Sequence, residues 1–101
     1  MPSNVLPAPR VRAVRVCLPA EEDGCAVLVF HSDVAGAVSY VLVTAAGVER
    51  TCADFASSSS CRAVFPSAPG CGVTLHAVDS SGEPGRSSTS FCVRARRPSD
   101  G

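Results

Sequence analysis

The sequence contains no tryptophan and no lysine, and its 101 residues include a single tyrosine, Tyr40. Aromatic residues make up 5% of the chain, so a buried core must be built from Val, Ala, Leu and the four Phe. Hydrophobic residues nevertheless reach 46%, which is too apolar for an intrinsically disordered chain. We therefore expect one small domain with a light core, in which covalent cross-links would add appreciably to a net stability of about 5–15 kcal/mol.

An excess of positive charge is also missing, because nine basic and nine acidic residues cancel at neutral pH. A dedicated nucleic-acid binder depends on neutralising phosphates, so this balance predicts no nucleic-acid partner. All nine basic residues are arginine, and six of them lie towards the two ends of the chain. We interpret these six as solvated positions on strand edges, and local basic patches are the alternative.

No segment has the length of a membrane span or the form of a secretion signal. The longest fully apolar run, CAVLVF, is far too short to cross a bilayer, and the opening MPSNVLPAPR lacks an apolar signal core. We expect no membrane insertion by this segment. We also expect a secretion signal to lie outside it, as in a module taken from a longer protein.

Six cysteines in a chain of this length are a high and even number. Such a number predicts disulfide bonds and an oxidising, extracellular compartment. A zinc site favours closely spaced cysteine pairs, whereas successive cysteines here have seven or more residues between them. A nucleophilic thiol needs a histidine held beside it, and no motif places His31 or His76 in that role. The sequence therefore predicts no metal, no cofactor and no catalytic centre.

Turn residues divide the chain into short segments, and no segment has helical periodicity. Apolar or alternating segments at a spacing of roughly 8–12 residues are typical of a β-sandwich or small barrel. We expect a sandwich domain over residues 9–96, a disordered or extended segment at residues 1–8 and a flexible tail at residues 97–101. The predicted strands span residues 10–16, 25–32, 37–45, 48–55, 61–65, 73–78 and 86–95.

Several of these segments resemble a fibronectin type III domain. The opening PAPRVRAVRV matches the Pro-initiated first strand of that family, and AVLVFHSD matches its second strand, with Phe30 in the place of a tryptophan. VSYVLV carries the third-strand tyrosine at Tyr40. FPSAPGCGVTLHAVDSSGEPGRSS follows the sixth-strand region, with Val73, Leu75 and Ala77 at the inward positions, so that His76 faces outward or towards a neighbouring strand.

The resemblance covers roughly residues 7–95. It implies an all-β fold, a seven-stranded antiparallel β-sandwich of the fibronectin type III or immunoglobulin-like kind; an immunoglobulin-like sandwich of other topology is the alternative. Two hallmarks of the family differ, because Phe30 replaces the tryptophan and Cys71 replaces the tyrosine that begins the sixth-strand motif. That tyrosine anchors a corner of the sandwich through its hydroxyl. Cysteine-rich members of the family, found in tandem extracellular arrays, carry similar cysteines near these strand ends.

The strand plan removes most of the 15 pairings that six cysteines allow. Cys71 and Cys92 flank the turn cluster DSSGEPG, and an antiparallel hairpin centred between Ser81 and Gly82 would bring them together. The same test places the other four cysteines around the turn segments PAEEDG and ADFASSSS. The predicted disulfides are Cys17–Cys25, Cys52–Cys61 and Cys71–Cys92.

The chain-entropy model values loops of this size at roughly 2.5–3.5 kcal/mol each, so three disulfides would offset the missing tryptophan and tyrosine. Cys71 would then replace the corner hydrogen bond with a covalent one. One conflict remains, because alternation places Phe91 and Val93 on the face opposite Cys92. An inward-pointing Cys92 therefore requires a bulge in the last strand.

The resemblance implies a non-catalytic extracellular protein-interaction or spacer module from a larger adhesion or receptor-type protein. Its partners would be another protein, whose identity the sequence does not give, and neighbouring domains in a longer chain. Members of the family often bind through the loop between the last two strands, here Ser80–Ser87, which lacks an Arg-Gly-Asp triplet. Glu83 and Arg86 are candidate binding residues by location. The alternative is a free-standing secreted ligand or inhibitor made rigid by disulfides.

Overall fold

The computed structural model describes residues 5–15, 25–52 and 59–93, which form eight β-strands and no helix. These segments are rich in Val and other apolar residues and are separated by Gly, Pro and Ser, a composition that favours pleated strands joined by turns. The strands are β1 (Val11–Arg15), β2 (Cys25–His31), β3 (Ser39–Val43), β4 (Glu49–Thr51), β5 (Ser60–Phe65), β6 (Gly70–Val78), β7 (Pro84–Ser87) and β8 (Phe91–Val93).

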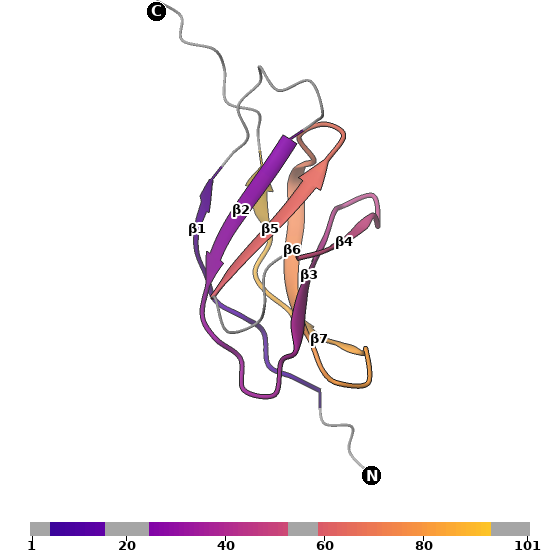
Figure 1. The fold of residues 1–101 in the computed structure, drawn as a ribbon. Helices are drawn as coiled ribbons and strands as arrows, with labels where there is room; N and C mark the ends of the chain where they lie inside the picture. The colour runs from indigo at the N-terminus through magenta and orange to yellow at the C-terminus, as the bar shows by residue number, and fades with distance from the viewer. Residues whose placement is uncertain (1–4, 16–24, 53–58, 94–101) are drawn as a thin grey trace, which may run out of the picture.

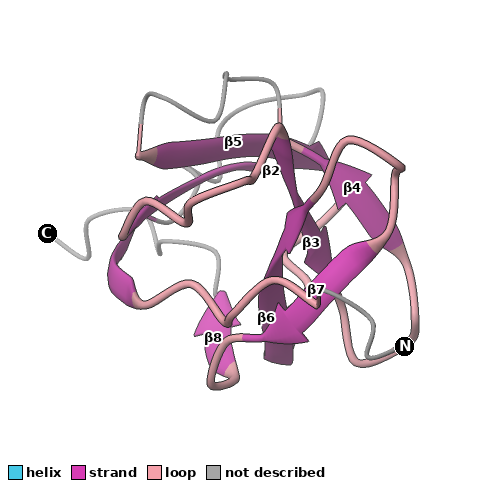
Figure 2. Ribbon diagram, turned by 90° about the horizontal axis from the view of Figure 1, so that it is seen from below, coloured by secondary structure: helices cyan, strands magenta, loops and turns pink. Residues whose placement is uncertain are grey.

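Two antiparallel sheets pack face to face, and Figure 2 shows the two layers most clearly (Figures 1 and 2). One sheet has the strand order β1-β2-β5, and the other has the order β4-β3-β6-β7. β7 pairs with the end of β6, and β8 pairs with its beginning. The structure therefore confirms the expected all-β architecture of two antiparallel sheets.

The expected seven strands become eight because the predicted last strand is divided into β7 and β8. Ser88, between them, turns its side chain inward: its Oγ accepts a hydrogen bond from Leu75 N at 2.9 Å and donates one to Thr89 O. Ser88 N in turn donates to Leu75 O at 2.9 Å. A side-chain oxygen thus substitutes for a ladder carbonyl, and the regular pairing is interrupted at this point.

The core lies between the sheets and is built mainly from small aliphatic side chains. Val73, Leu75 and Ala77 are all 0% exposed, which confirms the predicted inward face of β6. They meet Val27 and Val29 of β2 across the interior. The remaining buried members of this cluster are Val34, Tyr40, Leu42, Cys52, Cys61, Ala63, Phe65 and Val93.

The prediction that Phe30 takes the buried place of the family's tryptophan is wrong, because Phe30 is 37% exposed. Val27 and Val29 point inward, so strand alternation directs His31 inward and Phe30 outward. The buried ring at this position is His31, which is 2% exposed and lies 4.2 Å from the ring centre of Tyr40.

Tyr40 also supplies a hydroxyl anchor within the core. Its hydroxyl oxygen accepts a hydrogen bond from Val34 N at 3.0 Å, which ties the β2–β3 connection to the middle of the sandwich. Cys71, expected to replace such a corner bond, is exposed. Cys71 nevertheless forms the predicted covalent bond, to Cys92, and its replacement of the corner hydrogen bond stays a prediction.

Two of the three predicted disulfides are present in the described residues, Cys52–Cys61 and Cys71–Cys92. Cys52–Cys61 is buried and joins the end of β4 in one sheet to β5 in the other. Cys71–Cys92 is exposed and joins β6 to β8. The predicted partner of Cys25 lies in residues 16–24, outside the described residues, so that third pair stays a prediction.

A bulge in β6 turns Cys71 outward, to the side on which Cys92 lies. Gly70 pairs with Val93 and Val73 pairs with Phe91, so two residues of β6, Cys71 and Gly72, lie opposite Cys92 alone. Val93 is 0% exposed and Cys92 is exposed, so Cys92 does not point inward. The bulge that an inward Cys92 would have required in the last strand is therefore not needed; between β7 and β8, three residues (88–90) lie opposite the two at positions 74 and 75.

Residues 5–8 precede the first strand and belong to no strand themselves. Leu6 is half-buried against the core, and its carbonyl accepts a hydrogen bond from Arg86 N at 2.9 Å. A Cβ added at Gly85 would lie 2.5 Å from Leu6 O, so this close approach requires glycine. The described chain thus begins against β7.

Replacing Ser88 with alanine should destabilise the protein by about 1–3 kcal/mol, because Leu75 N would be left buried without an acceptor. Ser87→Ala is the matched control: Ser87 is exposed, and its replacement should change stability by less than about 0.5 kcal/mol. Urea unfolding of the oxidised proteins measures both values. Equal effects of the two substitutions would contradict the role assigned to the Ser88 hydroxyl.

A mild phosphine reductant should open Cys71–Cys92 before Cys52–Cys61, because only the first bond is exposed to solvent. Tryptic mapping after alkylation separates the two: residues 51–62 contain both Cys52 and Cys61, whereas Cys71 and Cys92 fall in different peptides. Alkylation of the 51–62 peptide before the peptides that contain Cys71 and Cys92 would contradict this order of reduction.

Candidate functional site

The predicted binding loop between β6 and β7 is a turn organised by Asp79. The carboxylate oxygen Oδ1 of Asp79 accepts hydrogen bonds from Ser81 Oγ at 2.6 Å, Ser81 N at 2.9 Å and Glu83 N at 3.1 Å. Gly82 adopts φ +88° and donates its N–H to Asp79 O at 3.0 Å. The hydrogen bond from the Ser81 side chain, followed by that from the Glu83 backbone, lowers the pKa of Asp79 below its ordinary value.

Glu83 and Arg86 are both exposed, as expected for loop residues. Glu83 lies in the loop, and Arg86 lies on β7, where its backbone N–H is occupied by Leu6 O. No hydrogen bond or ion pair joins their two side chains in the part of the chain described. Their role in binding stays a prediction from location.

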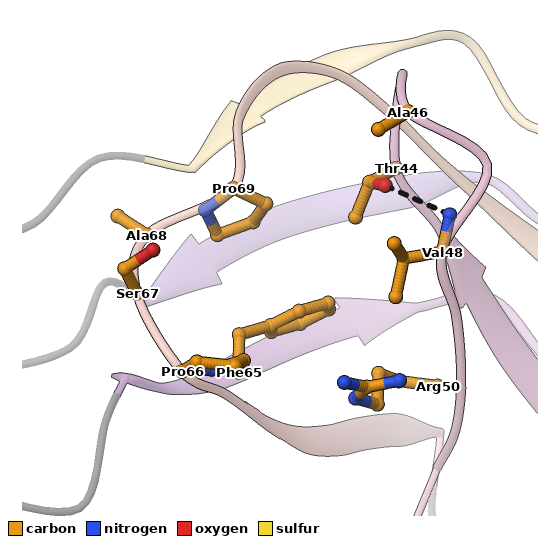
Figure 3. Close-up of a pocket in the computed structure, with 9 residues that line it drawn as sticks. All are labelled: Thr44, Ala46, Val48, Arg50, Phe65, Pro66, Ser67, Ala68 and Pro69. Atoms are coloured by element: carbon orange, nitrogen blue, oxygen red, sulfur yellow. Dashed lines mark hydrogen bonds between the residues drawn. The ribbon is translucent and has the colours of Figure 1, made fainter.

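A concave site not predicted from the sequence lies at the other end of β6 (Figure 3). It is an open groove of about 310 Å³. One wall is the β3–β4 hairpin, the other is the β5–β6 turn, and Phe65 forms the floor between them. The lining residues are Thr44, Ala46, Val48, Arg50, Phe65, Pro66, Ser67, Ala68 and Pro69.

The first wall has a fixed shape because TAAGV forms a three-residue hairpin loop. Thr44 N donates to Val48 O at 2.9 Å, and Gly47 N donates to Thr44 O at 2.9 Å. Gly47 adopts φ +88°, the left-handed conformation that this loop type requires at its last position. The Thr44 hydroxyl also accepts a hydrogen bond from Val48 N at 3.1 Å.

The second wall is the segment PSAP, which follows Phe65. Pro66 and Pro69 fix their own φ angles and so limit the conformations open to the turn. The β6 bulge then brings the two walls together: a Cβ added at Gly72 would lie 2.8 Å from Ala45 Cβ. Gly72 also adopts φ +82°, so both the close approach and the backbone require glycine.

Arg50 provides the only charged side chain among the described residues that line the groove. Its guanidinium carbon lies 5.8 Å from the centroid of the Phe65 ring, a cation–π arrangement that Figure 3 shows from the side. Its Nη1 donates a hydrogen bond to Glu49 O at 3.1 Å. The donors at Nη2 and Nε have no protein acceptor among the described residues.

The Cys52–Cys61 disulfide fixes the relative position of Arg50 and Phe65. These two residues come from different sheets, Arg50 from β4 and Phe65 from β5. Arg50 lies two residues before Cys52, and Phe65 lies four residues after Cys61. The covalent link therefore holds together the two strands that carry the guanidinium and the ring.

Sequence reasoning missed this groove because it depends on a contact between strands of different sheets. The turn signals AG and PSAPG were visible, but nothing in them indicates that the two turns lie side by side. The sequence does not mark Arg50 as a binding residue, because it is a single arginine in a weakly alternating segment. The pairing of Cys52 with Cys61 was the one available signal that β4 and β5 meet.

The two histidines are held by structural contacts. His31 Nδ1 bonds to Ser32 O at 2.8 Å, and its buried Nε2 has no hydrogen-bond partner. His76 Nδ1 bonds to Gly85 O at 3.0 Å, and its Nε2 lies 3.2 Å from Thr74 Oγ1. In the described ranges, no group of three or more His, Cys, Asp or Glu side chains could hold a metal.

None of the described residues belongs to a helix long and apolar enough to cross a membrane. No protein-family model, no curated protein and no solved structure matches the chain. The geometry of the sandwich and its groove therefore provides the basis for the functional argument.

Asp79→Asn should lower stability at neutral pH, and the difference from the wild type should shrink as the pH falls. The lowered pKa means that the ionised carboxylate stabilises the fold above its ordinary pKa, and that this contribution is lost as the pH falls through the folded-state value. Urea unfolding between pH 7 and pH 2 measures the difference. Glu49→Gln, which removes one exposed charge outside the turn, is the control; a pH-independent effect of Asp79→Asn would contradict the assignment.

Proposed function

We propose that this chain is a non-catalytic extracellular protein-interaction and spacer module of the fibronectin type III kind. The distribution of strands supports this assignment. Immunoglobulin-like sandwiches place the first, second and fifth strands in one sheet and the third, sixth and seventh in the other. The chain has β1, β2 and β5 together, and β3, β6 and β7 together, with β4 on the second sheet beside β3.

The observation that carries the proposal is the position of the two ends of the described chain. Leu6 lies against β7 beside the β6–β7 loop, at the end of β6 marked by Val78. Val93 pairs with Gly70, at the opposite end of β6 (Figure 1). The chain therefore enters at one end of the sandwich and leaves at the other, separated by roughly 26 Å at about 3.3 Å per residue. Modules with this geometry can be joined end to end.

The two disulfides are consistent with an extracellular or secreted protein, since such bonds persist in oxidising compartments. Disulfides also favour a spacer function, because they limit local unfolding in a domain whose core consists mainly of small side chains. The alternative, a free-standing secreted ligand or inhibitor, shares the compartment and the disulfides. It differs in needing no neighbouring domain at either end.

A screen of the oxidised chain against ectodomains and secreted proteins of its own organism tests the interaction function. The chain is presented as a multimer, so that weak binding becomes detectable through avidity. We expect saturable binding to at least one partner and loss of that binding after full reduction and alkylation. Absence of any saturable partner would contradict the interaction function, and binding by the reduced, alkylated chain would show that the folded module is not what binds.

A further inference from the structure

Among the described residues that line it, the groove between the β3–β4 hairpin and the β5–β6 turn has one positive side chain, Arg50, and no negative one. We propose that it binds a segment of a partner protein that presents an Asp or Glu carboxylate next to an apolar side chain. This inference rests on the proposed interaction function and names the surface and the chemistry that would carry it.

Arg50 has the donors for a carboxylate. One of its N–H groups is used by Glu49 O, while Nη2 and Nε have no protein acceptor among the described residues. The guanidinium carbon lies 5.8 Å from the centroid of the Phe65 ring, and the remaining donors point outward in the plane of the guanidinium. A planar guanidinium with free edge donors is the geometry that recognises carboxylates by paired hydrogen bonds.

The rest of the groove is apolar and small. Val48 is 40% exposed on one wall, Ala68 and the two prolines line the other, and the volume is about 310 Å³. That volume is at the lower limit of ligand pockets, which favours one or two side chains over a large ligand. An aliphatic or proline side chain next to the carboxylate would cover this surface.

The charge of the groove favours an acidic protein segment over a nucleic acid. Nucleic-acid binding relies on neutralising several phosphates along a strand, whereas the described residues of this lining supply a single guanidinium. One carboxylate balances one guanidinium, and the apolar walls add contacts that a phosphate backbone could not use.

The site is also preorganised. The Gly47 loop fixes one wall, two prolines restrict the other, and Cys52–Cys61 fixes Arg50 relative to Phe65. Little conformational freedom remains to be lost on binding, so a small contact area can still give a measurable affinity.

The test uses the oxidised full chain and blocked hexapeptides, acetylated and amidated so that the only carboxylate is a side chain. One pool has a fixed Leu-Glu pair with the other positions drawn from uncharged residues, and the matched pool has Leu-Gln. We expect Leu-Glu peptides to shift the backbone NMR signals of Val48, Arg50 and Ala68. Leu-Gln peptides should bind at least about tenfold more weakly, the loss typical of a hydrogen bond to a charged group.

Substitutions locate the interaction. Arg50→Gln should abolish the preference for Glu over Gln, and Ala46→Glu, on an exposed position of the groove wall, should repel the acidic peptides. Arg62→Gln is the matched control, because Arg62 is exposed on β5 but does not line the groove. It removes the same charge and should leave the preference intact. NMR spectra of each variant establish that it is folded.

Equal binding of the Glu and Gln pools would overturn the proposal, as would signal shifts confined to the β6–β7 loop. Shifts that depend on protein concentration without peptide would identify a second copy of the chain as the occupant and overturn it too. A partner found in the ectodomain screen whose binding is unaffected by Arg50→Gln would refute the groove while leaving the interaction function in place. Failure of the screen would remove the function itself.

Discussion

The Cys52–Cys61 disulfide is the constraint on which the arrangement of the two sheets depends. A sandwich is ordinarily held together by the apolar side chains between its layers, and here these are mostly Val, Ala and Leu, with no tryptophan. The buried disulfide adds a covalent link across that interface. It also places Arg50 above Phe65, so the same bond that fixes the layers shapes the groove at their margin.

The pairing of β6 with the last two strands contains an extra residue on each side. β6 carries one extra residue at Cys71–Gly72, and the opposing chain carries one at positions 88–90. The extra residue at 88–90 places Phe91 opposite the inward Val73, so that Val93 also faces the interior, and the bulge in β6 turns Cys71 outward to meet Cys92. The inward hydroxyl of Ser88 satisfies the backbone group that the second bulge leaves unpaired.

Strand positions and the inward face of β6 could be predicted because they depend on local alternation and turn residues. Two disulfides were predictable because each pair brackets a cluster of turn-forming residues in the sequence. Phe30 was misplaced because a family pattern was preferred to the alternation set by Val27 and Val29, which points to His31. The groove and the paired bulges could not be predicted, since they depend on contacts between strands that the sequence does not align. The function and the role of the β6–β7 loop stay predictions.

The exposed Cys71–Cys92 bond has a mechanical consequence. Force applied along a chain that enters at one end and leaves at the other reaches β6 through Cys71 and passes directly across the disulfide to Cys92. Once the module is pulled open, the residues between them, including most of β6, all of β7 and the turn organised by Asp79, lie outside this covalent path and carry none of the tension. The bond therefore limits how far a stretched module can extend.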